Sequence, residues 1–106
     1  MKPFILNLTE NTTSQRTPIL TVENAKKMKS GMVVLHSSEE VGEHNTNEKE
    51  ELIIVLEGNA TLEVEGSDIF EVKSGSVAYI PSRTKHNVRN KSDSKLRYLY
   101  VVTQTE

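Results

Sequence analysis

The chain has 106 residues, a length that suits one domain with a single core. It carries 13 basic and 15 acidic residues and a formal net charge of -2. This near balance gives no broad attraction to nucleic-acid phosphates or anionic lipid, so neither a nucleic acid nor a membrane is an expected partner. Cysteine is absent, which excludes disulfides, thiolate nucleophiles and zinc held by sulfur. Any metal site must therefore use nitrogen and oxygen ligands.

Residues 1–30 are largely polar and predict an N-terminal arm. A short strand is expected near residues 4–6, followed by an irregular segment over residues 7–17, which are rich in Thr, Ser and Asn. Residues 23–29 contain helix formers but almost no apolar face, so either one helical turn or a polar loop fits. The apolar run at the N-terminus is too short for the core of a signal peptide, and no longer apolar stretch could span a bilayer. We therefore expect a cytoplasmic protein.

Residues 31–106 predict a small antiparallel β-barrel or jelly roll that completes a single all-β domain. Short segments rich in Val, Ile, Leu and Tyr alternate with turn residues such as Gly, Asn, Ser and Asp. Many short strands at close spacing are typical of an antiparallel sandwich or barrel. In chain order, the expected strands span residues 32–36, 51–57, 60–65, 69–72, 77–80, 86–90 and 96–103.

Two of the three histidines, together with one glutamate, form a candidate metal site. Glu51 shares a strand face with apolar residues, and a carboxylate among core-facing positions is costly unless it has a partner. His86 shares its face with Val88, and His44 lies shortly before the strand of Glu51. Two imidazoles and one carboxylate can hold iron, manganese, nickel or zinc and leave coordination positions open. Either Glu50 or Glu51 could face inward from sequence alone.

Residues 75–90 follow the order Gly75, five residues, Pro81, one residue, Arg83, two residues, His86, three residues and Asn90. This pattern resembles the second conserved motif of the cupin superfamily. It departs from that motif in having Arg83 where the family usually has glycine. Arg83 is either a solvated loop residue or an anion contact near the pocket mouth.

A second pattern resembles the first cupin motif, in the order His44-x-Thr46, four residues, Glu51, six residues and Gly58. Thr46 stands where the family has a second histidine, and the upstream glycine is displaced to Gly42. The spacing from Gly58 favours Glu51 over Glu50 as the motif's glutamate. The two motifs cover residues 42–90, nearly half of the chain.

The resemblance implies a small single-domain cupin with a double-stranded β-helix that holds one divalent metal ion through His44, Glu51 and His86. Such a protein would act on a small organic acid, sugar or phenolic as a metal-dependent oxygenase, isomerase or lyase. The alternatives are a module that binds or senses a small ligand without catalysis, and a barrel that has lost its metal, as Thr46 suggests. The sequence does not choose among these three hypotheses.

The last expected strand favours a homodimer. Residues 96–102 are apolar on both faces, which suits burial on both sides, so this strand and the N-terminal arm are candidates for an intersubunit sheet. Tyr79, Tyr98 and Tyr100 are expected to be core or interface residues. If Tyr98 and Tyr100 share an inward face, one of them would line a ligand pocket.

Overall fold

The computed structural model describes residues 2–8, 15–66 and 69–105, and these contain nine strands and no helix. The predicted all-β class is therefore confirmed. The strands are β1 (Arg16–Leu20), β2 (Met28–Leu35), β3 (His44–Asn45), β4 (Lys49–Glu57), β5 (Asn59–Val64), β6 (Ile69–Lys73), β7 (Val77–Ile80), β8 (Lys85–Arg89) and β9 (Leu96–Gln104).

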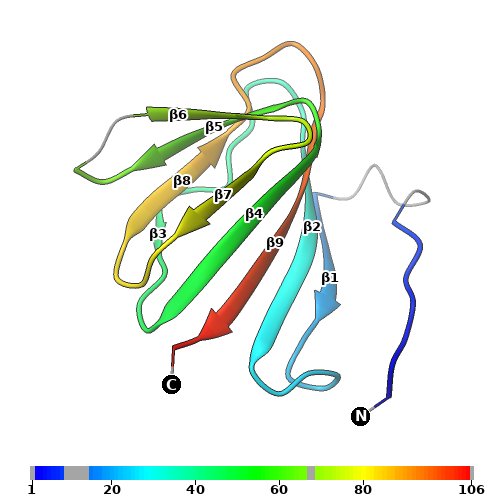
Figure 1. Cartoon of the computed structure of the whole chain (residues 1–106). Coiled ribbons are helices and arrows are strands. Elements are labelled where there is room, and N and C mark those ends of the chain that lie inside the picture. Colours follow the sequence, from blue (N-terminus) through cyan, green and yellow to red (C-terminus); the bar gives the residue numbers. More distant parts are fainter. Residues whose placement is uncertain (1, 9–14, 67–68, 106) are drawn as a thin grey trace.

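The strands form two antiparallel sheets that face each other (Figure 1). The large sheet has the order β1-β2-β9-β4-β7, and the small sheet has the order β3-β8-β5-β6. Except for the consecutive pairs β1-β2 and β5-β6, neighbours in each sheet come from distant parts of the chain, because most connections cross between the sheets. The result is the predicted jelly-roll architecture, a sandwich closed at one end and open at the other (Figure 1).

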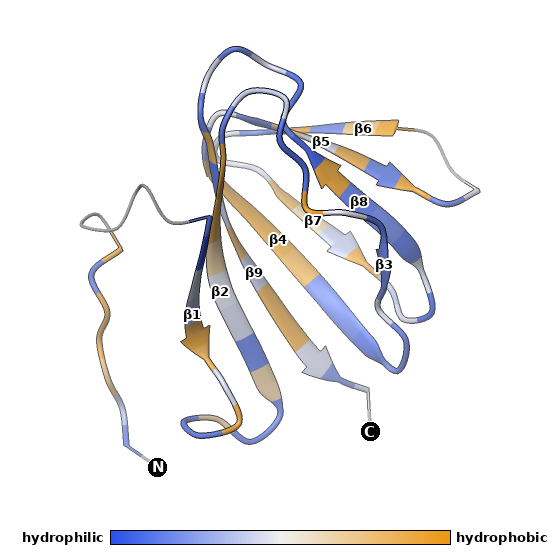
Figure 2. Ribbon diagram, turned by 180° about the vertical axis from the view of Figure 1, so that it is seen from behind, coloured by the Kyte–Doolittle hydropathy of each residue, from blue (hydrophilic) through white to orange (hydrophobic). Residues whose placement is uncertain are grey.

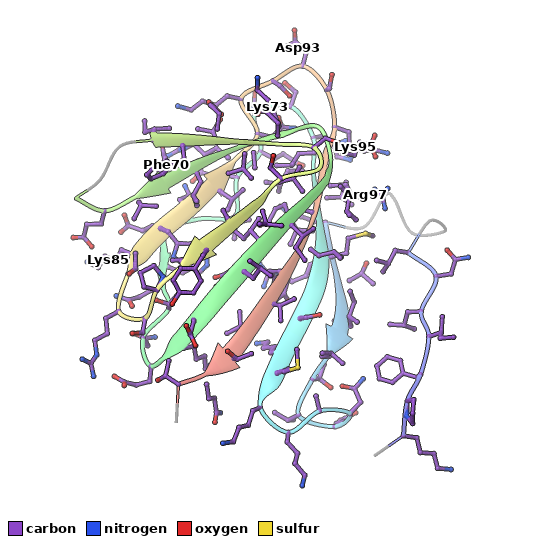
Figure 3. The ribbon with its side chains drawn as sticks, viewed as in Figure 1. Phe70, Lys73, Lys85, Asp93, Lys95 and Arg97 are labelled. Atoms are coloured by element: carbon purple, nitrogen blue, oxygen red, sulfur yellow. The ribbon has the colours of Figure 1, made fainter. Side chains whose placement is uncertain are left out.

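The core fills the space between the two sheets. Alternate residues of each strand point inward, so Ile53 and Val55 of β4 are buried while Leu52 and Ile54 are half-buried on the outer face. Figure 2 shows β4 changing from hydrophilic at its Lys49 end to hydrophobic further along, and Figure 3 shows the side chains between the sheets. The buried cluster consists of Val33, Leu35, Ile53, Val55, Ala60, Leu62, Val72, Ile80, Val88, Leu96 and Tyr98.

Several element boundaries differ from the sequence prediction in the N-terminal third. The strand expected near residues 4–6 is absent, and β1 instead begins at the end of the segment expected to be irregular and continues over residues for which no strand was predicted. Pro18 argues against a strand in the sequence, because proline cannot donate a backbone hydrogen bond to a neighbouring strand. β1 is an edge strand, however, where the missing N–H of proline is tolerated. Residues 23–27 form turns and bends, which agrees with the polar-loop alternative. Residues 9–14 of the predicted arm and residues 67–68 of the predicted turn lie outside the described residues.

The prediction that β9 forms an intersubunit sheet is wrong in this structure. β9 pairs with β2 along one edge and with β4 along the other. Its apolar character on both faces reflects a central position in the large sheet, where the backbone hydrogen bonds of both edges are already used. An intersubunit strand pair at β9 would require one of these two pairings to break.

Candidate metal centre

The three predicted ligands come from both sheets and meet at the open end of the sandwich. His44 of β3 lies directly opposite His86 of β8 in the small sheet, and their ring centroids are 4.1 Å apart. Glu51 projects inward from β4 of the large sheet, and its Oε1 lies 3.1 Å from His86 Nε2. One ligand atom from each of the three residues lies within 4.8 Å of the others. The structure therefore brings together the set that the sequence indicated.

Backbone carbonyls orient both imidazole rings. His44 Nδ1 donates to the carbonyl of Gly42 at 2.9 Å, and His86 Nδ1 donates to the carbonyl of Thr84 at 3.1 Å. Because a carbonyl can only accept, Nδ1 must carry the proton in each ring. The Nε2 lone pairs are then the ones available to a cation, and a fixed tautomer of this kind is usual for metal-binding histidine.

The pKa of His86 reflects its contact with Glu51. Burial lowers this pKa, since the side chain is excluded from solvent. The hydrogen bond to Glu51, the hydrogen bond to the Thr84 carbonyl and the charge of Glu51 all raise it. Together they outweigh burial, so the pKa of His86 lies above the usual value for histidine. A raised pKa means that a proton sits readily between His86 Nε2 and Glu51 Oε1. The contact therefore has the electrostatic character of a site for a cation.

The donor set fits a divalent transition-metal ion. Bonds from such ions to imidazole nitrogen and carboxylate oxygen are about 2.0–2.2 Å long, which places ligand atoms roughly 3–4 Å apart. The 4.8 Å limit that contains all three ligand atoms is slightly wider, so small side-chain rotations would suffice. Glu51 and His86 are 8% and 1% exposed, and His44 is exposed at the mouth.

Thr46, at the position where the resemblance expects a histidine, is committed to the backbone. Its hydroxyl donates to the carbonyl of Pro81 at 2.7 Å and accepts from the N–H of Thr84 at 3.0 Å. These two bonds tie the segment between β3 and β4 to the segment that leads into β8. Thr46 thus holds the chain next to the carbonyl that orients His86, and its hydroxyl proton is not available to a ligand.

Other residues singled out from the sequence fall outside the cluster. Glu50 is on the opposite face of β4, where its carboxylate accepts a hydrogen bond from Tyr79 Oη at 2.6 Å, so Glu51 is the inward residue. Arg83 is exposed and pairs with Glu48, which agrees with the solvated alternative. It has φ +55°, and this left-handed conformation explains why glycine suits the position. His36 is exposed and is not part of the His44, Glu51 and His86 cluster.

A cavity of about 190 Å³ adjoins the cluster, and His44, Glu51 and Thr46 form part of its wall. The predicted inward face of Tyr98 and Tyr100 is present, and both rings line this cavity. Burial, reinforced by the charge of Glu51, raises the pKa of Tyr98, so its phenol stays protonated. Three cationic residues of the wall were missed by sequence reasoning: Arg16, Lys29 and Lys49.

An antiparallel sandwich with a His-His-Glu cluster at its open end is a double-stranded β-helix with a candidate metal centre. A comparison with protein families matches residues 31–102 to the family described as Cupin domain. Since this match covers well over half of the chain, the chain belongs to the cupin family. A comparison with curated proteins finds no match.

Solved structures share this fold at low sequence identity. A protein of Bacillus halodurans is similar with TM-score 0.85 and 19% identity, over 99% of this chain and 83% of that chain. A protein of Thermus thermophilus is similar with TM-score 0.82 and 21% identity, over 94% of this chain and 96% of that chain. A protein described as a predicted oxalate decarboxylase of Thermotoga maritima has TM-score 0.74 and 20% identity, over 84% of this chain and 78% of that chain. These similarities support the fold.

Within the residues that the structure describes, no helix has the length and apolar character that a membrane crossing needs.

Proposed function

We propose that this cupin holds one divalent metal ion through His44, Glu51 and His86 and binds a small organic molecule in the adjoining cavity. The observation that carries this proposal is the convergence of three ligand atoms within 4.8 Å from strands of both sheets. Iron, manganese, nickel and zinc all suit two imidazoles and a carboxylate. When bound, such an ion would act as a Lewis acid toward oxygen atoms of the ligand.

The residues around the cluster supply orientation and shielding. The Gly42 and Thr84 carbonyls fix the two imidazoles, and the apolar core covers His86 from the closed end of the sandwich. His44 at the mouth leaves one side of the cluster open to the cavity. The arrangement suits a bound ion with coordination positions left for a ligand.

Elemental analysis and zinc calorimetry test the metal site. The untagged protein is expected to bind about one equivalent of metal, and His44→Gln and Glu51→Gln are expected to lose it. Glu50→Gln is the matched control, because Glu50 neighbours Glu51 in sequence but lies on the outer face of β4. If the parent binds no metal after loading, or if Glu50→Gln loses metal as fully as Glu51→Gln, the proposed centre is wrong.

A ligand-binding module without metal is a second candidate, and one observation favours it. The hydrogen bond between His86 Nε2 and Glu51 Oε1 satisfies both side chains without an ion. Calorimetry separates the two candidates: a parent protein that ignores metal but binds small ligands in its cavity would support this one. Turnover of small carboxylates or sugars by the metal-loaded protein would add a metal-dependent enzyme activity, of oxygenase, isomerase or lyase type, to the first.

We also propose a homodimer formed through the outer face of the large sheet. Strand register places apolar side chains in two adjacent rows across β7, β4 and β9, and Val77 and Tyr79 in these rows are 61% and 60% exposed. An exposed apolar surface of this kind favours self-association. The rows consist of Tyr79, Leu52 and Val101, and of Val77, Ile54 and Leu99.

A cytoplasmic location stays a prediction from the sequence.

A further inference from the structure

The cavity beside the candidate metal centre has an excess of positive charge. Its lining contains the cations Arg16, Lys29 and Lys49, and Glu51 is the sole acidic residue among the described residues that line it. Glu51 is already hydrogen-bonded to His86. A metal ion at the centre would add further positive charge. The cavity is therefore suited to an anion.

Arg16 differs from the other arginines of the chain. Arg83, Arg89 and Arg97 each form an ion pair with a glutamate. Within the described residues, Arg16 has no carboxylate partner, and its guanidinium carbon lies 5.7 Å from the centre of the Tyr100 ring. A guanidinium held over an aromatic ring keeps its N–H donors free for a planar, two-oxygen acceptor.

Tyr98 supplies a second donor beside Arg16. Its side chain is 3% exposed and lines the cavity, and its hydroxyl has no hydrogen-bond partner among residues 2–8, 15–66 and 69–105. Because the hydroxyl is not among the buried unpaired atoms of the described residues, it reaches the cavity and can donate to a ligand there. The residues that flank Tyr98 in the large sheet, Val33 and Val55, are aliphatic and offer this hydroxyl no side-chain acceptor.

Strand register puts these two donors in one row on the inner face of the large sheet. Arg16 pairs with Val33, and Val33 pairs with Tyr98, so the three side chains lie side by side across β1, β2 and β9. Glu51 lies two rows away along β4, since Val55 is in the row of Tyr98 and the row of Ile53 lies between Val55 and Glu51. The cavity thus has a donor end at Arg16 and Tyr98 and a candidate metal end at Glu51.

A missing side chain helps to form the donor end. Gly31 pairs with Tyr100, and a Cβ at position 31 would lie 2.7 Å from Tyr100 Oη and 2.9 Å from the carbonyl oxygen of Thr17. The absence of that Cβ allows the Tyr100 ring to cross β2 and lie under Arg16 of β1. The wall between the two ends includes Val33, Val41 and Val88, which suit an organic body rather than water alone.

We infer that the cavity binds a small organic carboxylate, with the carboxylate group held between the Arg16 guanidinium and the Tyr98 hydroxyl and the organic body directed toward the metal centre. This inference deepens the proposed function and rests on it for the second end of the ligand. One arginine fork with one phenol matches the two oxygens of a carboxylate. A phosphate group has three oxygens and would leave one without a donor at this end.

Binding of matched charged and neutral probes to the metal-free protein tests the inference. Butanoate and benzoate, with the neutral amides butanamide and benzamide, can be titrated while backbone amide chemical shifts are followed by NMR. The carboxylates are expected to shift residues of β2 and β9 that line the cavity, with the amides at least about tenfold weaker. Arg16→Gln is expected to weaken carboxylate binding by about tenfold. Arg16→Lys keeps the positive charge but loses the two-donor geometry of the guanidinium, so its carboxylate affinity should lie between that of the parent and that of Arg16→Gln.

Arg83→Gln is the matched control, because Arg83 is exposed, pairs with Glu48 and lies outside the cavity wall. Its carboxylate affinity should equal that of the parent. Equal binding of amides and carboxylates, or unchanged binding in a folded Arg16→Gln variant, would overturn the inference. Inorganic phosphate that displaces benzoate at comparable concentration would also overturn the choice of a carboxylate.

The same titration distinguishes this inference from the proposed metal function. Carboxylate binding that depends on Arg16 in a protein without metal affinity would support the inference and overturn the metal centre. Metal binding that depends on His44 and Glu51, without any charge-selective ligand binding, would support the metal centre and overturn the inference of a carboxylate site.

Discussion

The residue type at position 46 decides whether this position can ligate a metal ion or hydrogen-bond the backbone. In the cupin pattern a histidine stands here, whereas Thr46 bonds the Pro81 carbonyl and the Thr84 N–H. Thr46→Val keeps the shape and removes both bonds, so the free energy of unfolding should fall by about 1–3 kcal/mol. Thr46→His loses the same bonds but adds an imidazole, and zinc affinity should rise at least about tenfold over the parent.

Denaturant unfolding in chelator and zinc calorimetry measure these two effects separately. Thr46→Val serves as the control for the lost hydrogen bonds, since it cannot ligate a metal. Zinc affinity in Thr46→His equal to that in the parent would mean that position 46 does not face the cluster, and would count against the centre itself.

Protons should compete with metal at His86. The hydrogen bonds from His86 to Glu51 and to the Thr84 carbonyl raise the pKa of His86 despite its burial, so the ring holds its proton at higher pH than an ordinary histidine. A metal ion must displace that proton from Nε2. Lowering the pH from 8 to 6 should therefore weaken zinc binding, by about tenfold for each pH unit below the His86 pKa. Calorimetry across this range checks the slope, and a pH-independent affinity would contradict it.

The sequence indicated which three residues converge as a candidate metal centre but missed Arg16 in the cavity wall, and the difference has a physical cause. His44, Glu51 and His86 lie in two local patterns whose spacing is set by single strands and turns. Arg16 reaches the cavity only because β1 pairs with the next strand, β2, and the residues of β1 show no strand pattern that would have predicted this pairing. Its neighbour Pro18 also makes β1 look like irregular chain.

At the scale of elements, Asn90 fixes the connection between β8 and β9. It is fully buried, and its Nδ2 donates to the carbonyls of Leu35 and Ser94 at 2.9 and 2.8 Å. Its Oδ1 accepts from the N–H and the hydroxyl of Ser92. Asn90 belongs to the pattern that resembles the second cupin motif, and the structure explains why an asparagine suits this position. Its side-chain amide donates two hydrogen bonds to carbonyls through Nδ2 and accepts two through Oδ1, which a carboxylate of the same size cannot do.

Asn90→Asp should therefore destabilise the fold strongly. A carboxylate of the same shape cannot donate to Leu35 and Ser94, and it would be buried as an unpaired charge. The free energy of unfolding should fall by about 3–5 kcal/mol at pH 7, measured by urea denaturation. Asp93→Asn, an exposed change in the same connection (Figure 3), should alter it by less than about 0.5 kcal/mol. A loss as small as the control's would mean that Asn90 does not organise this connection.

Strand ends were predicted correctly where the apolar run ends together with the strand pairing. The prediction was wrong where the pairing continues into polar residues beyond the apolar run. β4 was predicted from Glu51, but it begins at Lys49 because β9 continues to pair with it as far as Gln104. β2 likewise begins at Met28, within a polar stretch, because it pairs with Thr103. The two-residue strand β3 has no apolar signal at all, although it positions His44.

At the scale of the whole molecule, the two faces of the large sheet have different roles. Its inner face changes from apolar core at the closed end to charged and aromatic residues at the cavity. Its outer face carries the two apolar rows, which no element of the described chain covers fully, since Val77 and Tyr79 remain exposed. β9 was expected to belong to an intersubunit sheet. Because both edges of β9 are already paired, the dimer that we propose uses the outer face of the large sheet instead.

If the dimer forms through this outer face, a charge introduced into the apolar rows should prevent dimerisation. Val77 is 61% exposed in one chain, so Val77→Glu should leave the chain folded yet place a carboxylate in the middle of an apolar interface. Light scattering at micromolar concentration should show a dimer for the parent and a monomer for Val77→Glu. Val22→Glu is the control, because Val22 is 91% exposed in the connection between β1 and β2 and lies outside the two rows. A monomeric parent would refute the homodimer, and a dimeric Val77→Glu protein would move the interface to another surface. The cavity opens from the inner face, so loss of the dimer should leave zinc and carboxylate affinity unchanged.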